Sequence, residues 1–311
     1  MSLTTRVSAA NEPRERSGAG VPASERAGGS GGAKPPGQMI DSHQHFWRYD
    51  AAQYGWIDDS MAPLRRDFLP EDLCTLMRAE GVAGTITVQA RQDEAETAWL
   101  LDLASRNTFI RGVVGWTDLQ APDAERRVEQ LAATPRLVGV RHVVQAEPAG
   151  FLHRPAFGRG IAALVRADLV YDILIYARQL PEAIRFAAAF PRQRFVLDHL
   201  GKPDIRAGGF DGWRRHLAEL ATLPHVWCKL SGLVTEADWR SWTPDALRPY
   251  LDAALESFGP SRVMLGSDWP VCTLAASYAG VIGLVRDAVA EYSADERAQI
   301  LGGTAEAVYL S

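Results

Sequence analysis

Residues 171–200 read YDILIYARQLPEAIRFAAAFPRQRFVLDHL, and they contain one complete repeat of the pattern that decides the fold. Two short apolar runs, 171–176 and 194–200, flank a segment at 181–191 with Pro in its first turn and a helical character. A strand, a helix and a second strand in this order predict two parallel strands, because a parallel pair needs a crossover connection.

The same alternation extends through the chain from residue 39 onward. Eight β-rich apolar runs alternate with longer helical segments, and these runs are 39–43, 84–90, 110–116, 137–144, 171–176, 194–200, 225–232 and 262–268. Eight such units match the size and count of a (β/α)8 TIM-like barrel, an α/β fold. The alternative is a doubly wound open sheet, but no glycine-rich phosphate-binding motif follows the first strand. Pro249 is expected to kink or split a helix at 244–259.

Residues 1–38 differ in composition from the rest of the chain. They contain no aromatic residue and are rich in Gly, Ala, Ser and Pro. Such a segment buries too little apolar surface to offset its ordering entropy, so we predict a disordered tail before a barrel domain at 39–311. It has no apolar h-region, which predicts the absence of a secretory signal.

Charge and composition exclude several classes of protein. The net charge of −5 provides no basic excess for nucleic acid. No apolar stretch approaches the roughly 20 residues that span a bilayer. The three cysteines lie far apart without a C-x-x-C pair, which favours reduced thiols. We therefore expect a cytoplasmic enzyme with a small-molecule substrate, and a homodimer is compatible with such a barrel.

Polar residues gather where the predicted strands end, which is where barrel enzymes place their active sites. His43 and His45 end the first strand two residues apart and can point to one face. Asp268 ends the last strand, the neighbour of the first in a closed barrel, and His199 ends the sixth. Three imidazoles and a carboxylate are ligand types that a zinc-like ion prefers. Other polar residues near strand ends are Gln89, Trp116, Asp118, Arg141, His142, Asp198, Lys229, Ser231 and Ser267.

Each of these residues also has a structural interpretation. A single histidine at a strand end is more often a core or surface residue than a ligand, and Asp268 could cap the following helix. The coincidence of the histidine pair, His199 and Asp268 at one end of the barrel favours a site. The remaining histidines, His153, His216 and His225, are interpreted as structural.

Five motifs in this order resemble the amidohydrolase superfamily over residues 39–311. They are MIDSHQHFW (39–47), GVRHVVQ (139–145), FVLDHLGKP (195–203), CKLSGL (228–233) and RVMLGSDWPV (262–271). Within the superfamily they are most similar to the sugar-lactonase branch, which contains enzymes of the L-fuconolactonase, L-rhamnono-lactonase and pyrone-dicarboxylate lactonase kinds.

The resemblance implies a barrel whose metal ligands are His43, His45, His199 and Asp268. The fourth strand lacks a bridging Lys or Glu and the fifth lacks a terminal His, so at most one divalent ion is expected, zinc or alternatively manganese. Catalysis without metal remains the alternative, with the histidines and Arg141 as hydrogen-bond donors. Asp268 is the expected acid–base residue, with His199 as the second catalytic group.

The expected reaction is the opening of an aldonolactone, such as L-fuconolactone or L-rhamnonolactone, to the aldonic acid. A decarboxylase, an amide hydrolase and a dicarboxylate-lactone hydrolase are alternatives on the same scaffold, and a non-catalytic ligand-binding barrel is a further one. Candidate substrate-binding residues are Trp47, Gln89, Arg141, His142, Tyr176, Arg178, Lys202 and Trp269.

Overall fold

A computed structural model describes residues 37–311, which belong to one compact unit. The predicted tail at 1–38 lies outside the described residues except for its last two positions. None of the helices described in residues 37–311 is both long and apolar enough to cross a membrane.

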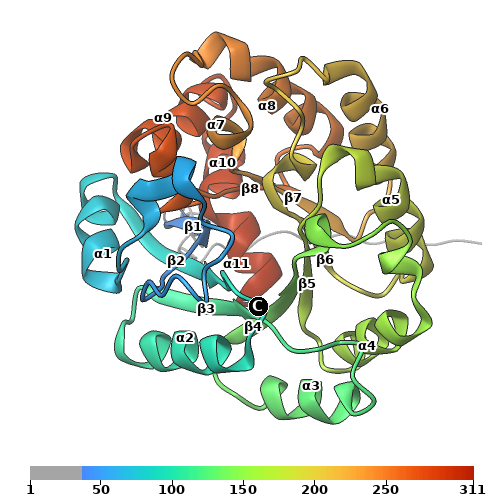
Figure 1. Cartoon of the computed structure of the whole chain (residues 1–311). Coiled ribbons are helices and arrows are strands. Elements are labelled where there is room, and N and C mark those ends of the chain that lie inside the picture. Colours follow the sequence, from blue (N-terminus) through green and yellow to red (C-terminus); the bar gives the residue numbers. More distant parts are fainter. Residues whose placement is uncertain (1–36) are drawn as a thin grey trace, which may run out of the picture. The chain divides into compact units, whose positions relative to one another are not determined.

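Eight parallel strands form one sheet in which each strand pairs with the next along the chain. This order confirms the predicted barrel (Figure 1). The strands are β1 (Met39–Gln44), β2 (Val82–Val88), β3 (Ile110–Gly115), β4 (Leu137–His142), β5 (Val170–Ile173), β6 (Phe195–Leu197), β7 (Val226–Leu230) and β8 (Val263–Leu265).

Helices surround the sheet and complete the repeats (Figure 1). The outer helices are α1 (Pro70–Ala79), α2 (Glu94–Arg106), α3 (Ala124–Ala132), α4 (Pro155–Arg166), α5 (Leu180–Ala189), α6 (Phe210–Ala221), α8 (Pro244–Phe258) and α9 (Tyr278–Ala288). Three shorter helices are α7 (Leu233–Glu236), α10 (Ala294–Ala298) and α11 (Thr304–Tyr309). Pro249 lies inside α8, which runs unbroken from Pro244 to Phe258, so it does not split the helix. Its missing N–H costs a single intrahelical hydrogen bond, which the helix tolerates.

The barrel closes between β8 and β1 through hydrogen bonds at the C-terminal ends of the two strands and just beyond them. His45 N–H donates to the Trp269 carbonyl (2.7 Å), and Asp268 N–H donates to the His43 carbonyl (2.8 Å). The Ser42 hydroxyl donates to the Leu265 carbonyl (2.6 Å). The closure therefore fixes the backbone of the H-x-H segment directly against the backbone of Asp268.

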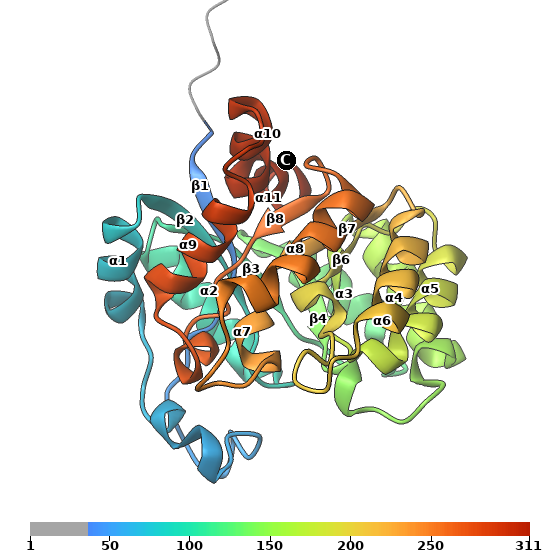
Figure 2. The same ribbon diagram turned by 90° about the horizontal axis from the view of Figure 1, so that it is seen from above.

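The apolar core lies in two layers. One layer fills the space between the strands and the outer helices, and the other fills the barrel interior. Helix α11 closes the interior at the N-terminal ends of the strands, where Val308 and Tyr309 pack against Ile40 and Met264. Figure 2 shows α10 and α11 at one end of the barrel and α7 toward the other. Polar side chains are therefore free to gather at the C-terminal end, which we call the barrel mouth.

Candidate active site at the barrel mouth

Four side chains predicted from the sequence meet at the barrel mouth. His43 lies on β1 and His45 directly follows it, whereas His199 and Asp268 follow β6 and β8 with φ of 54° and 57°. β6 and β8 end earlier than the predicted runs, at Leu197 and Leu265, so both residues lie in the turns that follow the strands. Non-glycine residues rarely adopt this left-handed conformation, and it is concentrated at functional sites.

The four side chains lie close together. The Nε2 atoms of His43 and His45 are 3.2 Å apart. The Asp268 Oδ1 atom lies 3.4 Å from His45 Nε2, 3.8 Å from His43 Nε2 and 3.9 Å from His199 Nε2. All four residues are buried, and none exposes more than 5% of its surface.

A partner on the Nδ1 side orients each imidazole. His45 Nδ1 lies 2.8 Å from the Val88 carbonyl, and His199 Nδ1 lies 2.9 Å from the Ser231 hydroxyl. The carbonyl only accepts, so His45 carries its proton on Nδ1 and presents the free Nε2 lone pair to Asp268. Such backing fixes the ring orientation that a metal ligand needs.

The neighbours of His43 lie on both sides of its ring. Its Nδ1 lies 3.2 Å from both Asp198 Oδ1 and Lys229 Nζ, and its Nε2 lies 3.3 Å from the Arg141 guanidinium. Asp198 accepts hydrogen bonds and Lys229 donates them, so a proton on Nδ1 matches Asp198 and leaves Nε2 as the nitrogen available to a metal ion. Burial lowers the pKa of His43 well below its ordinary value and lowers that of His199 to about 4. Both rings are therefore neutral near pH 7, which is the form that binds a metal.

Asp268 is held as a carboxylate. Burial alone would raise its pKa, but interactions with His199, His45 and His43 bring the pKa below its usual range. An ionised carboxylate beside three imidazoles is equipped to accept a proton or to bind a cation.

A layer of buried charges supports His43 from beneath. Lys229 Nζ lies 2.5 Å from Asp172 Oδ2 and 3.0 Å from Asp198 Oδ1, and all three side chains are fully buried. Arg141 binds the other Asp198 oxygen at 3.0 Å, and the hydroxyl of Tyr309 donates to Asp172 at 2.7 Å. Two cations thus compensate two carboxylates, and they lie directly under the site.

The pKa values of the two carboxyls differ in this layer. Burial raises the pKa of both Asp172 and Asp198. For Asp198 this effect is outweighed by Lys229, His43 and Arg141, which bring its pKa well below the usual range.

The sequence placed Asp198 and Lys229 near strand ends, but it gave no reason to connect them to Asp172 or to Tyr309. The contact between Lys229 and Asp172 spans 57 residues, and the contact between Tyr309 and Asp172 spans 137 residues.

The donor set fits one divalent metal ion. Ligand atoms of His43, His45 and Asp268 all lie within 4.8 Å of one another. Ligands on a tetrahedral zinc, with bonds of about 2.0–2.1 Å, are separated by roughly 3.3 Å. The separations of 3.2 and 3.4 Å around His45 Nε2 match this value. His199, whose Nε2 lies 3.9 Å from Asp268, stands beside this set.

The candidate substrate-binding residues occupy different environments. Trp47 and Trp269 are buried and pack edge-on against Phe68, so the structure gives both indoles a packing role. Gln89 is also buried and donates to the Arg141 carbonyl at 3.2 Å. Both indoles are covered by the segment 46–69, in which Trp47 pairs with Phe68 through a β-bridge.

His142 has both ring nitrogens engaged. The Trp116 indole N–H lies 3.3 Å from Nδ1, and Glu147 Oε1 lies 2.9 Å from Nε2. Because the indole only donates, His142 is protonated at Nε2 and uses that proton on Glu147. The ring also stacks on Phe151, with centroids 4.7 Å apart.

Tyr176, Arg178 and Lys202 lie at the barrel mouth with part of their surface open. Both basic side chains lie over the Tyr176 ring, with the Arg178 guanidinium 4.6 Å and Lys202 Nζ 5.5 Å from its centroid. Lys202 also pairs with Glu236 at 3.5 Å. The sequence reasoning missed Glu236, because its position at the end of the short helix α7 follows no strand-end pattern.

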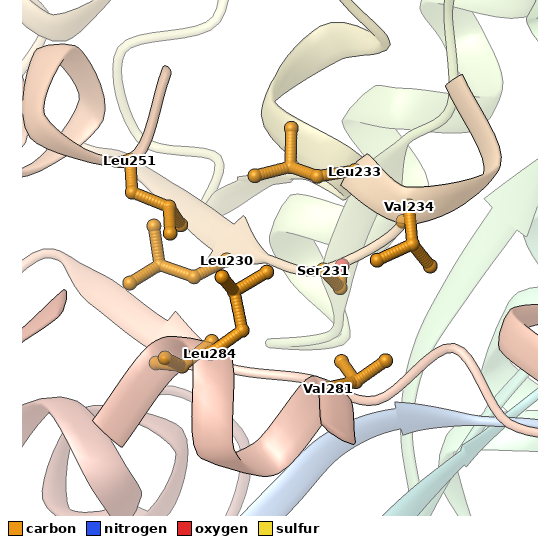
Figure 3. A pocket seen from close by; sticks show the side chains of 9 residues that line it. Leu230, Ser231, Leu233, Val234, Leu251, Val281 and Leu284 are labelled. Atoms are coloured by element: carbon orange, nitrogen blue, oxygen red, sulfur yellow. The ribbon is translucent and has the colours of Figure 1, made fainter. Parts of the chain in front are cut away.

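Figure 3 shows a small pocket between α7, α8 and α9. Apart from Ser231, the side chains that line it are apolar: Leu230, Leu233, Val234, Leu251, Val281, Leu284 and Val285. A pocket with a single hydroxyl provides no acid–base or metal chemistry, so it is a packing feature beside the site.

Comparisons with known proteins agree with this geometry. A family model described as amidohydrolase matches residues 40–310. An L-fucono-1,5-lactonase of Burkholderia multivorans is 49% identical, covering 87% of this chain and 95% of that protein. An L-fucono-1,5-lactonase of Burkholderia ambifaria is 38% identical, covering 86% and 93%. A crystal structure of an amidohydrolase from Burkholderia multivorans with bound zinc matches with a TM-score of 0.85 at 48% identity, covering 88% of this chain and 99% of that chain.

Proposed function

The chain belongs to the amidohydrolase family, and we propose that it hydrolyses a neutral sugar lactone such as L-fucono-1,5-lactone to the aldonic acid. The observation that carries the proposal is the meeting of Asp268 with three imidazole Nε2 atoms, in a chain 49% identical to an L-fucono-1,5-lactonase. The alternative substrate L-rhamnonolactone differs only in the hydroxyl configuration that the mouth must recognise.

In this proposal, Asp268 removes a proton from the attacking water as the water oxygen bonds to the lactone carbonyl carbon. The bond to the ring oxygen then breaks, and Asp268 returns the proton to the departing alkoxide, so the carboxylate is regenerated. We expect His199, which Ser231 contacts at Nδ1, to stabilise the oxyanion that develops.

The residues that would hold a divalent ion are His43, His45 and Asp268, with His199 beside them. When bound, zinc supplies Lewis-acid polarisation of the carbonyl and acidifies water; manganese is the alternative ion. The charged layer of Asp198, Lys229 and Arg141 keeps the His43 ring in the orientation that ligation needs.

The charge balance of the mouth favours a neutral lactone over a dicarboxylate. A dicarboxylate would need unpaired basic side chains in the pocket. Arg141 is already paired with Asp198 and Lys202 with Glu236, which leaves Arg178 on the exposed side of Tyr176.

Location in the cytoplasm and assembly as a homodimer remain predictions of the sequence.

The test is hydrolysis of a panel of L- and D-sugar 1,4- and 1,5-lactones, followed with a pH indicator. Asp268→Asn should lower kcat by roughly 10²–10⁴-fold, because the amide cannot accept the proton. Asp287→Asn, an exposed position on α9, is the matched control and should retain wild-type turnover. Absence of turnover on every lactone by the wild type refutes the proposal and directs the search to carboxylic-acid and amide substrates.

A further inference from the structure

Glu236 and Lys202 form a second polar group at the barrel mouth, beside the hydrolytic residues. Lys202 lies three residues after His199 and donates its backbone N–H to the His199 carbonyl at 2.8 Å. Glu236 ends α7, which begins directly after Ser231 and Gly232, and Ser231 binds His199 Nδ1 at 2.9 Å. The two segments that carry the pair are thus the segments that hold His199.

The exposure of this pair distinguishes it from the ion pairs on the outer helices. The side chains of Lys202 and Glu236 are 18% and 19% exposed, so each is largely desolvated but open on one side. By contrast, the Arg214–Glu256 pair between α6 and α8 is 55% and 65% exposed. Partly desolvated charged groups that remain reachable form stronger hydrogen bonds with a ligand than fully hydrated ones.

The Glu236 carboxylate has acceptor capacity to spare. Among the residues that the structure describes, Lys202 is the one side chain that donates to it, whereas a carboxylate accepts about four hydrogen bonds. Burial raises the pKa of Glu236 and Lys202 lowers it, and the negative charge of Asp268 is among the groups that act on it. Glu236 therefore lies within electrostatic reach of the hydrolytic carboxylate.

Tyr176 adds an apolar face to the group. Its ring lies under Lys202 Nζ at 5.5 Å, and the Ala177 backbone N–H donates to the Lys202 carbonyl at 3.3 Å. The two carboxylate oxygens of Glu236 accept hydrogen bonds, the Lys202 ammonium donates them, and the Tyr176 ring is apolar. Together they match the surface of a polyhydroxylated ring, which has hydroxyl groups on its edges and C–H groups on its faces.

We infer that Glu236, oriented by Lys202, binds hydroxyl groups of the substrate ring and makes the enzyme selective for polyhydroxylated lactones. The inference rests on the proposed lactonase function and adds a specificity residue to it. Glu236 accepts hydrogen bonds from two neighbouring hydroxyls, Lys202 donates to one of them, and the ring packs on Tyr176. Each hydroxyl that a substrate lacks then leaves the desolvated carboxylate without its hydrogen-bond partner. An unpaired polar group in the site discriminates between substrates more strongly than the loss of an apolar contact does.

The experiment compares L-fucono-1,5-lactone with δ-valerolactone, the six-membered lactone without hydroxyls. Glu236→Gln should lower kcat/KM for the fuconolactone at least tenfold, mainly through KM, and change kcat/KM for δ-valerolactone less than twofold. Lys202→Met should act in the same direction, because it releases Glu236 from its orientation. Glu256→Gln breaks the outer ion pair and is the matched control, with neither lactone affected.

In the lactone assays, two results overturn the inference: equal kcat/KM for Glu236→Gln and wild type on the fuconolactone, or equal losses on both lactones. Thermal unfolding of each variant confirms that it folds. Binding of L-fucose, which has the ring hydroxyls but no ester, gives a second readout by calorimetry. Tenfold weaker L-fucose binding by Glu236→Gln than by the wild type supports the subsite, even when no lactone is hydrolysed. Absence of lactone hydrolysis alone refutes only the lactonase function. The subsite is overturned when Glu236→Gln binds L-fucose as tightly as the wild type does, or when the wild type does not bind L-fucose detectably.

Discussion

Gly232 lies directly against the ring of His199. A Cβ atom at position 232 would come within 2.5 Å of His199 Nδ1, and the backbone there has a φ of +68°. Both the space and the conformation therefore require glycine at this position. The turn between β7 and α7 is in this way fitted to a site residue that is 33 positions earlier in the chain.

Gly232→Ala should displace the His199 ring and separate it from Ser231. We expect kcat/KM for the lactone to fall by about a hundredfold, because a displacement of about 1 Å at a reacting group has this effect. Gly212→Ala is the control, since that helical glycine on α6 has no atom within 4 Å of the added Cβ and no positive φ. Wild-type kinetics in Gly232→Ala would contradict a catalytic position for His199.

Lys229→Met should be strongly destabilising. It leaves Asp172 and Asp198 buried without the cation that lies between them, and breaking a buried pair in this way costs roughly 3–5 kcal/mol. Denaturant unfolding measures the loss. The double variant Lys229→Met with Asp172→Asn should recover part of it, because Arg141 still pairs with Asp198 and the one excess negative charge is then removed. No recovery would mean that the loss arises from packing of the lysine chain.

His45→Gln should weaken zinc binding. His45 Nε2 is the atom with the shortest separations to the other candidate ligands, 3.2 Å to His43 and 3.4 Å to Asp268. We expect the wild type to retain about one zinc ion per chain after dialysis and His45→Gln to retain far less. Removal of the ion by a chelator should lower wild-type turnover, and added zinc should restore it.

His153→Gln is the control for zinc binding, since His153 is exposed and lies away from the cluster. Metal-free wild-type protein with full turnover would instead support the alternative in which the histidines and Arg141 act as hydrogen-bond donors. Zinc content by elemental analysis distinguishes this result from incomplete metal removal.

Asp41 gives the stability a defined dependence on pH. Burial raises its pKa to about 6, although the Ser267 and Tyr278 hydroxyls and two backbone N–H groups donate to it. Because the pKa of Asp41 is higher in the folded state than in the unfolded state, this group adds to the free energy of unfolding at low pH. That contribution is complete below the unfolded pKa of 3.8 and is lost as the pH rises through the folded pKa of about 6.

The wild type should therefore gain stability relative to Asp41→Asn as the pH falls. The relative gain should be about 1 kcal/mol between pH 7.5 and pH 5, because the amide does not titrate. Denaturant unfolding of both proteins at the two pH values measures it, and the comparison cancels all other titrating groups. An unchanged difference would show that Asp41 keeps an ordinary pKa.

The sequence predicted the barrel and the four residues at its centre. The apolar runs and helical segments have periods that can be read locally, and eight repeats of strand and helix leave few architectures. His43, His45, His199 and Asp268 stood out because each follows a predicted strand, and the ends of parallel strands share one edge. Burial of a run on both faces was likewise visible in its composition.

The tertiary structure alone decided what surrounds these four residues. The contact of Lys229 with Asp172, the place of Tyr309 beneath the site and the pairing of Glu236 with Lys202 join side chains from separate elements. Trp47 and Trp269, which the sequence suggested as substrate contacts, are packed within the core because the loop after β1 folds over them. A local pattern determines which face of an element a side chain occupies, but its partners depend on how the elements pack, and packing is a property of the whole chain.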